Sequence, residues 1–276
     1  GSWRYRDDMS IPCDYHLHTR FSPDSAASMA EMCEAAIQRG LHEICFTEHV
    51  DLSPWEETRD FFKPEAYVAE ARRCQEVYGD RLTIHIGIEA GEPQLVRGEL
   101  GALLSAWPFD FVLGSAHWID RGGAYFSEVY RVHPADHVER EYFQRVLELV
   151  EGGDFDSLGH LDLVRRYRPE ALGPFEPAGH EEVIREILRT IVRRGKAIEI
   201  NTSPLRKGLG ATCPDLTVLR WYRELGGKQV TVGSDSHGPD QVGTGFDVAQ
   251  EMLRMAGFSR VARFRRRQLE WIDLEW

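Results

Sequence analysis

The sequence predicts an α/β fold in which parallel strands form a TIM-like barrel within a single domain. Short apolar runs alternate regularly with helical segments, and each crossover is long enough to return the next strand parallel to the last. The chain carries neither the Gly-x-Gly-x-x-Gly fingerprint nor the Walker loop of nucleotide-binding folds. Imidazole and carboxylate side chains recur where the apolar runs end, which is where such barrels place their active sites.

The predicted strands are short apolar runs bounded by turn residues. The seven runs cover residues 13–18, 43–47, 82–88, 111–115, 155–159, 197–200 and 229–233. Residues 1–12 form an irregular lead, in which Gly1 and Ser2 are consistent with the remnant of a purification tag. No repeat or shift in composition divides residues 13–276, so we expect one barrel domain there.

Capping residues predict where several helices begin and end. Ser28 and Glu31 form a capping box, and Gly40 closes the helix that they open. Pro64 suits the first position of the next helix, and Asp215 suits the N-cap of a helix late in the chain. The other helices are expected at residues 93–106, at 135–150, in a segment ending at 194, and at 247–256.

Three further stretches lie outside this regular alternation. The loops 50–62 and 118–133 are rich in aromatic residues and are candidates for lids over the rim of the barrel. The basic run 263–267 is flanked by apolar residues. We interpret it as a solvated edge strand rather than a patch that binds nucleic acid.

Composition and charge exclude several classes of protein. The 276-residue chain has a net charge of -12 and a pI near 5.4, which disfavours electrostatic binding to nucleic acid. No apolar run reaches the roughly 18 residues of a membrane span, and no signal peptide opens the sequence. The five cysteines are odd in number and lack a C-x-x-C pair, which favours free thiols in a reducing cytoplasm. We therefore expect neither a membrane nor a nucleic acid as partner.

Candidate metal ligands follow six of the predicted strands. His16 and His18 point to the same face of the first strand, because side chains alternate along an extended chain. Further donors follow the later strands, namely Glu48 and His49, Glu89, His117, His160, Asp235 and His237. One histidine is weak evidence, but the agreement between strand ends indicates a metal site. The remaining histidines have no such neighbours, and we interpret them as ordinary structural residues: His42, His85, His133, His137 and His180.

The donor types indicate the metal and the chemistry. Imidazole and carboxylate without thiolate suit zinc, manganese or iron. The donors exceed what one tetrahedral ion uses, so we expect several divalent ions, with Glu89 bridging two of them through its two oxygens. Close metal pairs suit the hydrolysis of phosphate esters. Amidohydrolase barrels are the rival, but their two-metal sites often use a strand-end lysine, which this chain lacks. Glu48, His49 and His237 suit a third ion.

Six segments resemble motifs of the PHP (polymerase and histidinol phosphatase) family. They are Asp14-Tyr15-His16-Leu17-His18-Thr19, Phe46-Thr47-Glu48-His49, Gly87-Ile88-Glu89, Gly114-Ser115-Ala116-His117, Gly159-His160-Leu161-Asp162 and Gly233-Ser234-Asp235-Ser236-His237. The resemblance spans nearly the whole chain and implies a distorted (β/α)7 barrel with three divalent metal ions. It implies that the first ion binds His16, His18, Glu89 and Asp235, the second Glu89, His117 and His160, and the third Asp24, His49 and His237. Asp24 enters through this resemblance alone.

Other segments resemble the histidinol-phosphate phosphatases within that family. They are the run from Asn201 to Lys207, His160 to Asp162 followed by Arg165-Arg166-Tyr167, and the tail from Gly257 to Arg267. This resemblance implies a small-molecule phosphate ester, L-histidinol phosphate, as the substrate. It also implies that Arg166 and Arg206 hold the phosphate, with Arg165 less favoured; guanidinium groups suit that task because they bind phosphate through two hydrogen bonds.

We expect that a hydroxide bridging the first two ions attacks the phosphorus atom of the ester. Glu89, Asp235 and His237 belong to the expected catalytic set, and Asp162 is a candidate acid for the leaving group. Three alternatives stay open: an esterase acting on nucleotides, oligonucleotides or another small phosphate ester, an amidohydrolase, and a non-catalytic metal-binding module.

Overall fold

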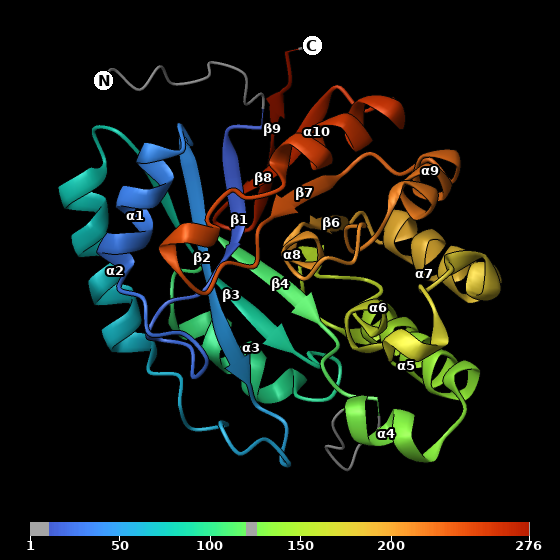
Figure 1. Cartoon of the computed structure of the whole chain (residues 1–276). Coiled ribbons are helices and arrows are strands. Elements are labelled where there is room, and N and C mark those ends of the chain that lie inside the picture. The colour runs from blue at the N-terminus through green and yellow to red at the C-terminus, as the bar shows by residue number, and fades with distance from the viewer. Residues whose placement is uncertain (1–10, 120–125, 276) are drawn as a thin grey trace.

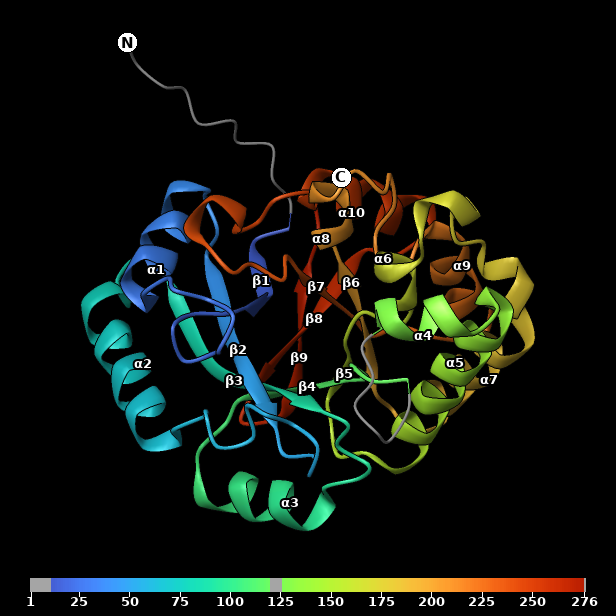
Figure 2. The same cartoon turned by 60° about the horizontal axis from the view of Figure 1, so that its bottom comes forward.

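The computed structural model describes residues 11–119 and 126–275, in which seven parallel strands form one sheet in the order β1-β2-β3-β4-β5-β6-β7. The strands are β1 (Cys13–Leu17), β2 (Glu43–Asp51), β3 (Thr83–Gly91), β4 (Phe111–Ser115), β5 (Ser157–Leu158), β6 (Ala197–Asn201) and β7 (Val230–Gly233). The first and last strands meet where His18 N donates to Ser236 O at 2.8 Å. The sheet thus curls into a nearly closed barrel (Figures 1 and 2), which confirms the predicted fold. Of the predicted lead 1–12, residues 1–10 lie outside the described part.

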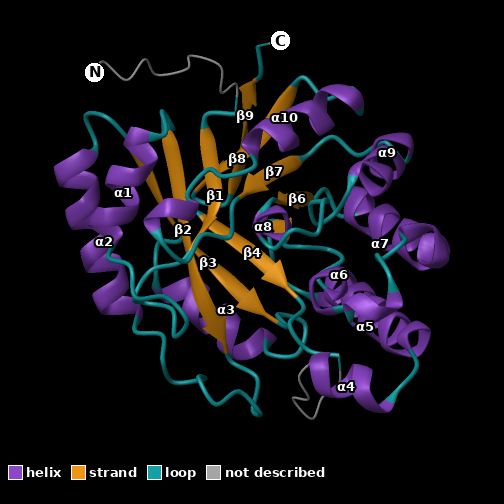
Figure 3. Cartoon of the chain, viewed as in Figure 1, coloured by secondary structure: helices purple, strands orange, loops and turns teal. Residues whose placement is uncertain are grey.

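Helices surround the strands on the outside of the barrel (Figure 3). They are α1 (Met29–Gln38), α2 (Pro64–Tyr78), α3 (Arg97–Ala106), α4 (Phe126–Val132), α5 (Ala135–Gly152), α6 (Val164–Tyr167), α7 (Glu181–Arg193), α8 (Ser203–Arg206), α9 (Leu216–Glu224) and α10 (Phe246–Met255), with the 3-10 turns η1 (Glu170–Leu172), η2 (Pro177–His180) and η3 (Pro239–Gln241). The predicted caps are confirmed. Ser28 and Glu31 form a capping box on α1, and the Asp215 carboxylate caps α9.

Two strands extend further than predicted. β2 and β3 pass the predicted ends at residues 47 and 88 and stay paired in register, with His49 opposite Glu89. The polar residues there looked like the beginnings of loops, but their backbones remain hydrogen-bonded in the sheet. β5 is shorter than the predicted run 155–159. Because the extended strands carry His49, Asp51 and Glu89, these side chains stand on rigid elements rather than on loops.

The two candidate lid loops are partly regular. The stretch 118–133, predicted to be irregular, contains α4, and its residues 120–125 lie outside the described part. The stretch 50–62 begins as the end of β2 and then turns back on itself, where Arg59 Nη1 donates to Leu52 O. A lid function for either stretch stays a prediction.

The basic run 263–267 differs from the predicted solvated edge strand. It lies in a separate antiparallel hairpin of β8 (Arg260–Arg265) and β9 (Gln268–Asp273). Arg263 binds Glu43 at 2.9 Å, and Arg267 binds Asp156 at 3.0 Å. Both carboxylates stand at the N-terminal ends of barrel strands, so the hairpin closes the base of the barrel and its arginines are used for ion pairs.

The base of the barrel is filled by aromatic side chains. Tyr15 and Phe111 are fully buried, and their rings meet edge to face with centroids 5.2 Å apart; the Phe264 ring lies 5.2 Å from that of Phe111. Within residues 11–119 and 126–275, we find no helix with the length and apolar character needed to span a bilayer. The packed base leaves the opposite, C-terminal end of the strands for a functional site.

A buried histidine joins two carboxylates at this base. His85 is 5% exposed and lies 3.3 Å from a Glu43 oxygen and 3.6 Å from an Asp110 oxygen. Burial alone would lower the pKa of His85, but the carboxylates of Asp110 and Glu43 outweigh it and raise the pKa to about 9. His85 is therefore a structural cation, in agreement with its interpretation from the sequence.

Replacing His85 by Gln should change how stability depends on pH. Because the pKa of His85 rises on folding, protonated His85 adds to the free energy of unfolding. This contribution is fully present below about pH 6.5 and is lost as the pH passes about 9. From about pH 6 to about pH 9.5, the wild-type protein should lose on the order of 2 kcal/mol more unfolding free energy than the variant. Urea unfolding across this range measures the difference, with the exposed His42→Gln as the control. Parallel curves for the wild type and His85→Gln would contradict the prediction.

Candidate metal centre

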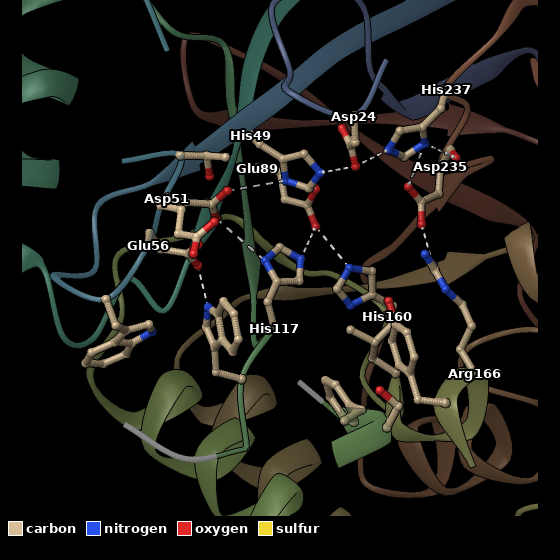
Figure 4. Close-up of a pocket in the computed structure, with 18 residues that line it drawn as sticks. Asp24, His49, Asp51, Glu56, Glu89, His117, His160, Arg166, Asp235 and His237 are labelled. Atoms are coloured by element: carbon tan, nitrogen blue, oxygen red, sulfur yellow. Dashed lines mark hydrogen bonds and ion pairs between the residues drawn. The ribbon is translucent and has the colours of Figure 1, made fainter. Parts of the chain in front are cut away.

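A cavity of about 410 Å³ opens at the C-terminal ends of the barrel strands (Figure 4). It is lined by Asp24, His49, Asp51, Trp55, Glu56, Glu57, Thr58, Glu89, His117, Trp118, Phe126, Ser127, His160, Leu163, Arg166, Tyr167, Asp235 and His237. His16 and His18 are fully buried and contact the lining residue Glu89. The fold thus brings the predicted strand-end donors, with the exception of Glu48, together at one place.

The His16 and His18 imidazoles lie side by side, with ring centroids 5.1 Å apart. The alternation of β1 aims both rings inward, as predicted. Gly233, at the end of β7, permits this placement. A Cβ at residue 233 would collide with the His16 Cβ and with a Glu199 oxygen, so the Gly-Ser-Asp-Ser-His segment needs glycine at its first position.

The Glu89 carboxylate occupies the middle of the cluster. Its Oε2 atom lies 3.2 Å from Nε2 of His16, from Nε2 of His18 and from Nδ1 of His49. Its Oε1 atom lies 3.1 Å from His117 Nε2 and 2.9 Å from His160 Nε2. Burial alone would raise the pKa of Glu89, but the surrounding imidazoles hold it well below its ordinary value. The two oxygens therefore face two different sets of donors, which is the geometry of a bridging ligand.

A further group of donors surrounds the Asp24 carboxylate. Asp24 Oδ2 lies 3.0 Å from His237 Nε2 and 3.3 Å from His49 Nε2. His18 stacks on both rings, with centroids 4.3 Å from His49 and 4.4 Å from His237. Burial, together with the neighbouring His49, lowers the pKa of His18 to about 3, which favours its neutral, metal-binding form.

Glu48 does not join this group. Its buried carboxylate accepts hydrogen bonds from Thr19 N, from Thr19 Oγ1 at 2.7 Å and from Ser22 Oγ at 2.6 Å. The side chain points away from the cavity because neighbouring residues of a strand face opposite sides. The expectation that Glu48 helps to bind a third ion is therefore wrong. Its hydrogen bonds instead fix the loop that carries Asp24.

Asp235 links the donors to an arginine. Its Oδ1 atom lies 3.5 Å from His16 Nε2, and its Oδ2 atom accepts a hydrogen bond from Arg166 Nη1 at 2.8 Å (Figure 4). Asp235 adopts a φ of +54°, a backbone conformation that favours glycine. Burial alone would raise the pKa of Asp235, but His16 and Arg166 keep it well below its usual range.

The donor set fits divalent metal ions. Four groups of donor atoms lie close enough to share an ion: His16, His18 and Glu89; His16, His160 and Asp235; His49, Glu89 and His117; and His18, Asp24, His49 and His237. The observed separations resemble the ligand–ligand spacing of about 3.3 Å expected around a tetrahedral zinc ion. His18 Nε2 and His49 Nδ1 are buried without a well-formed hydrogen bond within the described part of the chain. The groups overlap through Glu89, His16, His18 and His49, as a polynuclear centre requires.

Two acidic residues of the centre were missed in the sequence. Glu199 is 1% exposed; its Oε2 lies 2.5 Å from His16 Nδ1, and its Oε1 accepts from His160 N at 3.0 Å. Asp51 Oδ1 lies 3.7 Å from His117 Nδ1. The available signal for Glu199 was a carboxylate in the middle of the apolar β6 run, because such residues are rarely buried without a partner.

Three of the predicted substrate or catalytic residues do not reach the cavity lining. Asp162 is fully buried and binds Arg165, which also binds Asp215 at 2.9 Å. This placement argues against Asp162 as the acid for a leaving group, and it explains why Arg165 is not available for phosphate. Arg206 donates to Asp235 O at 3.1 Å and to Thr244 Oγ1 at 2.9 Å, outside the lining. Of the three arginines, Arg166 is the one that faces the cavity.

The fold and the site define the class: an α/β barrel protein whose C-terminal rim is suited to several metal ions. A model of the PHP domain matches residues 14–203. The chain is also 34% identical over 265 residues to the histidinol-phosphatase of Lactococcus lactis subsp. lactis, over 91% of this chain and 93% of that one. The chain therefore belongs to the PHP domain family, as its motifs predicted.

Two further comparisons agree with this family. A relative from Clostridium acetobutylicum, described as a probable histidinol-phosphatase, is 32% identical over 241 residues, which cover 87% of this chain and 91% of that one. The solved structure of the Lactococcus lactis histidinol phosphate phosphatase, in complex with zinc, L-histidinol and phosphate, matches with a TM-score of 0.85 at 31% identity. The match covers 94% of this chain and 99% of that one.

Replacing Glu199 by Gln should weaken metal binding without unfolding the barrel. The amide cannot replace both carboxylate oxygens that hold His16 and His160, so the affinity for zinc should fall by about 10- to 100-fold. Competition with a fluorescent chelator measures this affinity, and urea unfolding of the metal-free protein checks the fold. Glu251→Gln, on the exposed face of α10, should bind zinc like the wild type. Unchanged zinc affinity in Glu199→Gln would rule out this positioning role.

Proposed function

We propose that the protein is a metal-dependent phosphomonoesterase that hydrolyses L-histidinol phosphate to L-histidinol and phosphate. The observation that carries the proposal is the group of donors around Glu89 with Arg166 beside it in one cavity. The relationship to the Lactococcus lactis enzyme over nearly the whole of both chains supports the choice of substrate.

The donors divide among three divalent ions, for which zinc, manganese and iron are the candidates. His16, His18, Glu89 and Asp235 would hold the first, Glu89, His117 and His160 the second, and Asp24, His49 and His237 the third. Such ions activate water as a nucleophile at neutral pH and stabilise charge on phosphoryl oxygens. The proximity of His160 to His16 and Asp235 also lets it approach the first ion.

Arg166 would bind the phosphate. Its Nη1 atom donates to Asp235 and, at 3.1 Å, to Ser203 Oγ, which fixes the plane of the guanidinium. Its Nη2 atom has no hydrogen-bond partner in the described part of the chain, so a donor is left for a phosphoryl oxygen. Arg206 would act indirectly, because its contact with Asp235 O holds the loop that places Asp235.

The cavity lining favours a phosphate ester over an amide substrate. Among the described lining residues there is no lysine, which two-metal amidohydrolase sites often use, and the cation present is an arginine suited to phosphate. The five cysteines are buried and free, which supports a reducing, cytoplasmic location. We also propose that residues 13–276 act as one catalytic domain.

A panel of phosphate esters tests the substrate. The metal-loaded enzyme should release phosphate from L-histidinol phosphate with a kcat/KM about tenfold or more above that for a nucleoside monophosphate or a sugar phosphate. Chelation should abolish turnover, and Glu89→Gln should lower kcat by about 100-fold or more, because it removes a shared ligand. Metal content is measured in parallel, with Glu251→Gln as the control. Full activity in Glu89→Gln, or a preference for nucleotides, would overturn the proposal.

Replacement of Arg166 should lower kcat/KM more than replacement of Arg206. Arg166→Ala should lower kcat/KM by about 30- to 100-fold and weaken inhibition by inorganic phosphate, because a charged hydrogen bond to the substrate is lost. Arg206→Ala should have the smaller effect, since its side chain lies outside the cavity lining. Steady-state kinetics and metal analysis of both variants measure this order. A larger loss in Arg206→Ala would reverse the assignment.

A further inference from the structure

The cavity has a second chemical surface beside the metal centre. Trp55, Glu56 and Glu57 come from the loop after β2, and Trp118 follows His117 after β4. These four residues contribute no donor to the groups suited to metal ions. They form an acidic and aromatic wall, which we define as Trp55, Glu56, Glu57 and Trp118.

Among the described residues, no lysine or arginine is paired with the carboxylates of this wall. Within residues 11–119 and 126–275, Arg166 is the one Lys or Arg residue in the lining. Figure 4 places Glu56 and Arg166 at opposite ends of the row of labelled residues. The lining therefore carries Arg166, paired with Asp235, at one end and the Glu56 carboxylate at the other.

Glu56 is held in place by the opposite segment of the rim. Trp118 Nε1 donates to Glu56 Oε1, and the backbone N–H of Trp118 donates to the buried carboxylate of Glu92 at 3.1 Å. On the other side, Arg59 ties the loop of Glu56 to Leu52 O and to Glu99. Trp118 thus anchors Oε1 of Glu56. Within residues 11–119 and 126–275, Oε2 of Glu56 has no hydrogen-bond donor, so it can accept from a ligand, as a specificity group requires.

We propose that Glu56, supported by Glu57 and the rings of Trp55 and Trp118, selects phosphate esters whose leaving group carries a positive charge. This inference rests on the proposed function, since the phosphate is taken to lie between the metal donors and Arg166. The leaving group then extends toward Glu56, where an ammonium or imidazolium group gains a charge-assisted hydrogen bond and contact with indole faces. A neutral or anionic leaving group would leave the carboxylates uncompensated, so the wall also selects against nucleotides and sugar phosphates.

Matched substrates and a conservative variant test the proposal. The substrates are L-histidinol phosphate, its N-acetyl derivative, which lacks the ammonium charge, and p-nitrophenyl phosphate. Glu56→Gln should lower kcat/KM for L-histidinol phosphate by about 10- to 100-fold, mainly through KM, because the charged contact is lost while an oxygen remains for Trp118. Its kcat/KM for p-nitrophenyl phosphate should stay within about twofold of the wild type. N-acetylation of the substrate should reduce the kcat/KM of the wild type more strongly than the kcat/KM of Glu56→Gln.

Glu57→Gln should show a smaller effect of the same sign, and Glu65→Gln, on the exposed start of α2, should show none. Equal losses for L-histidinol phosphate and p-nitrophenyl phosphate in Glu56→Gln would overturn the specificity role, and so would an unchanged KM for L-histidinol phosphate. If the wild type hydrolyses p-nitrophenyl phosphate but does not prefer the cationic ester, the proposed role of the acidic and aromatic wall is wrong, while the proposed phosphatase function stands. If the metal-loaded wild type hydrolyses neither ester, the proposed function itself fails.

Discussion

The structure depends on one buried carboxylate, Glu89, whose negative charge faces five imidazoles. A carboxylate that is 1% exposed loses the hydration that stabilises it in water, and the cost is several kcal/mol unless positive charge replaces that hydration. The barrel supplies this charge by bringing the ends of β1, β2, β4 and β5 around β3. Protonated imidazoles can balance part of the charge, and divalent ions balance it more strongly. The strand ends must therefore meet for both folding and function.

A second ring of contacts fixes the orientation of these imidazoles. An imidazole binds a metal through one nitrogen, so the partner of its other nitrogen decides the tautomer and the tilt of the ring. A neighbouring set of contacts closes the barrel, because Asp14 on β1 accepts from His16 N and from Ser234 N and Gly243 N beyond β7. The backbone of His16 is thus held at the point where the first and last strands meet. The partners of the ring nitrogens are Glu199 for His16, Ser22 for His18, Asp51 for His117 and the Asp235 carbonyl for His237.

The sequence predicted the parts of the site that follow from local pattern. Alternation along a strand determines which side chains share a face, and recurrence at strand ends indicated a common rim, so His16, His18, Glu89 and Asp235 were found. It did not predict which distant groups pair in the interior. Glu48 looks like a ligand by position, yet it is bound by Thr19 and Ser22, which only the fold brings near. Asp162 is bound by its sequence neighbour Arg165, and only the fold adds the second partner of that arginine, Asp215. The hairpin of β8 and β9 was missed for the same reason, since its arginines are explained by carboxylates far away in the chain.

In this protein the type of reaction depends mainly on residues of the strands, whereas the choice of substrate depends on residues of the connections between them. Apart from Asp24, which stands on the loop after β1, the metal donors stand on or next to strands, and hydrogen bonds of the sheet set the spacing of His49 and Glu89, which lie opposite each other. The groups that contact a leaving group stand on connections, which tolerate changes in sequence without loss of the barrel. Glu56 becomes part of the site only because Trp118, on a separate connection, donates to it. A motif on a strand therefore identifies the chemistry directly, whereas substrate choice depends on contacts between loops, which local pattern does not encode.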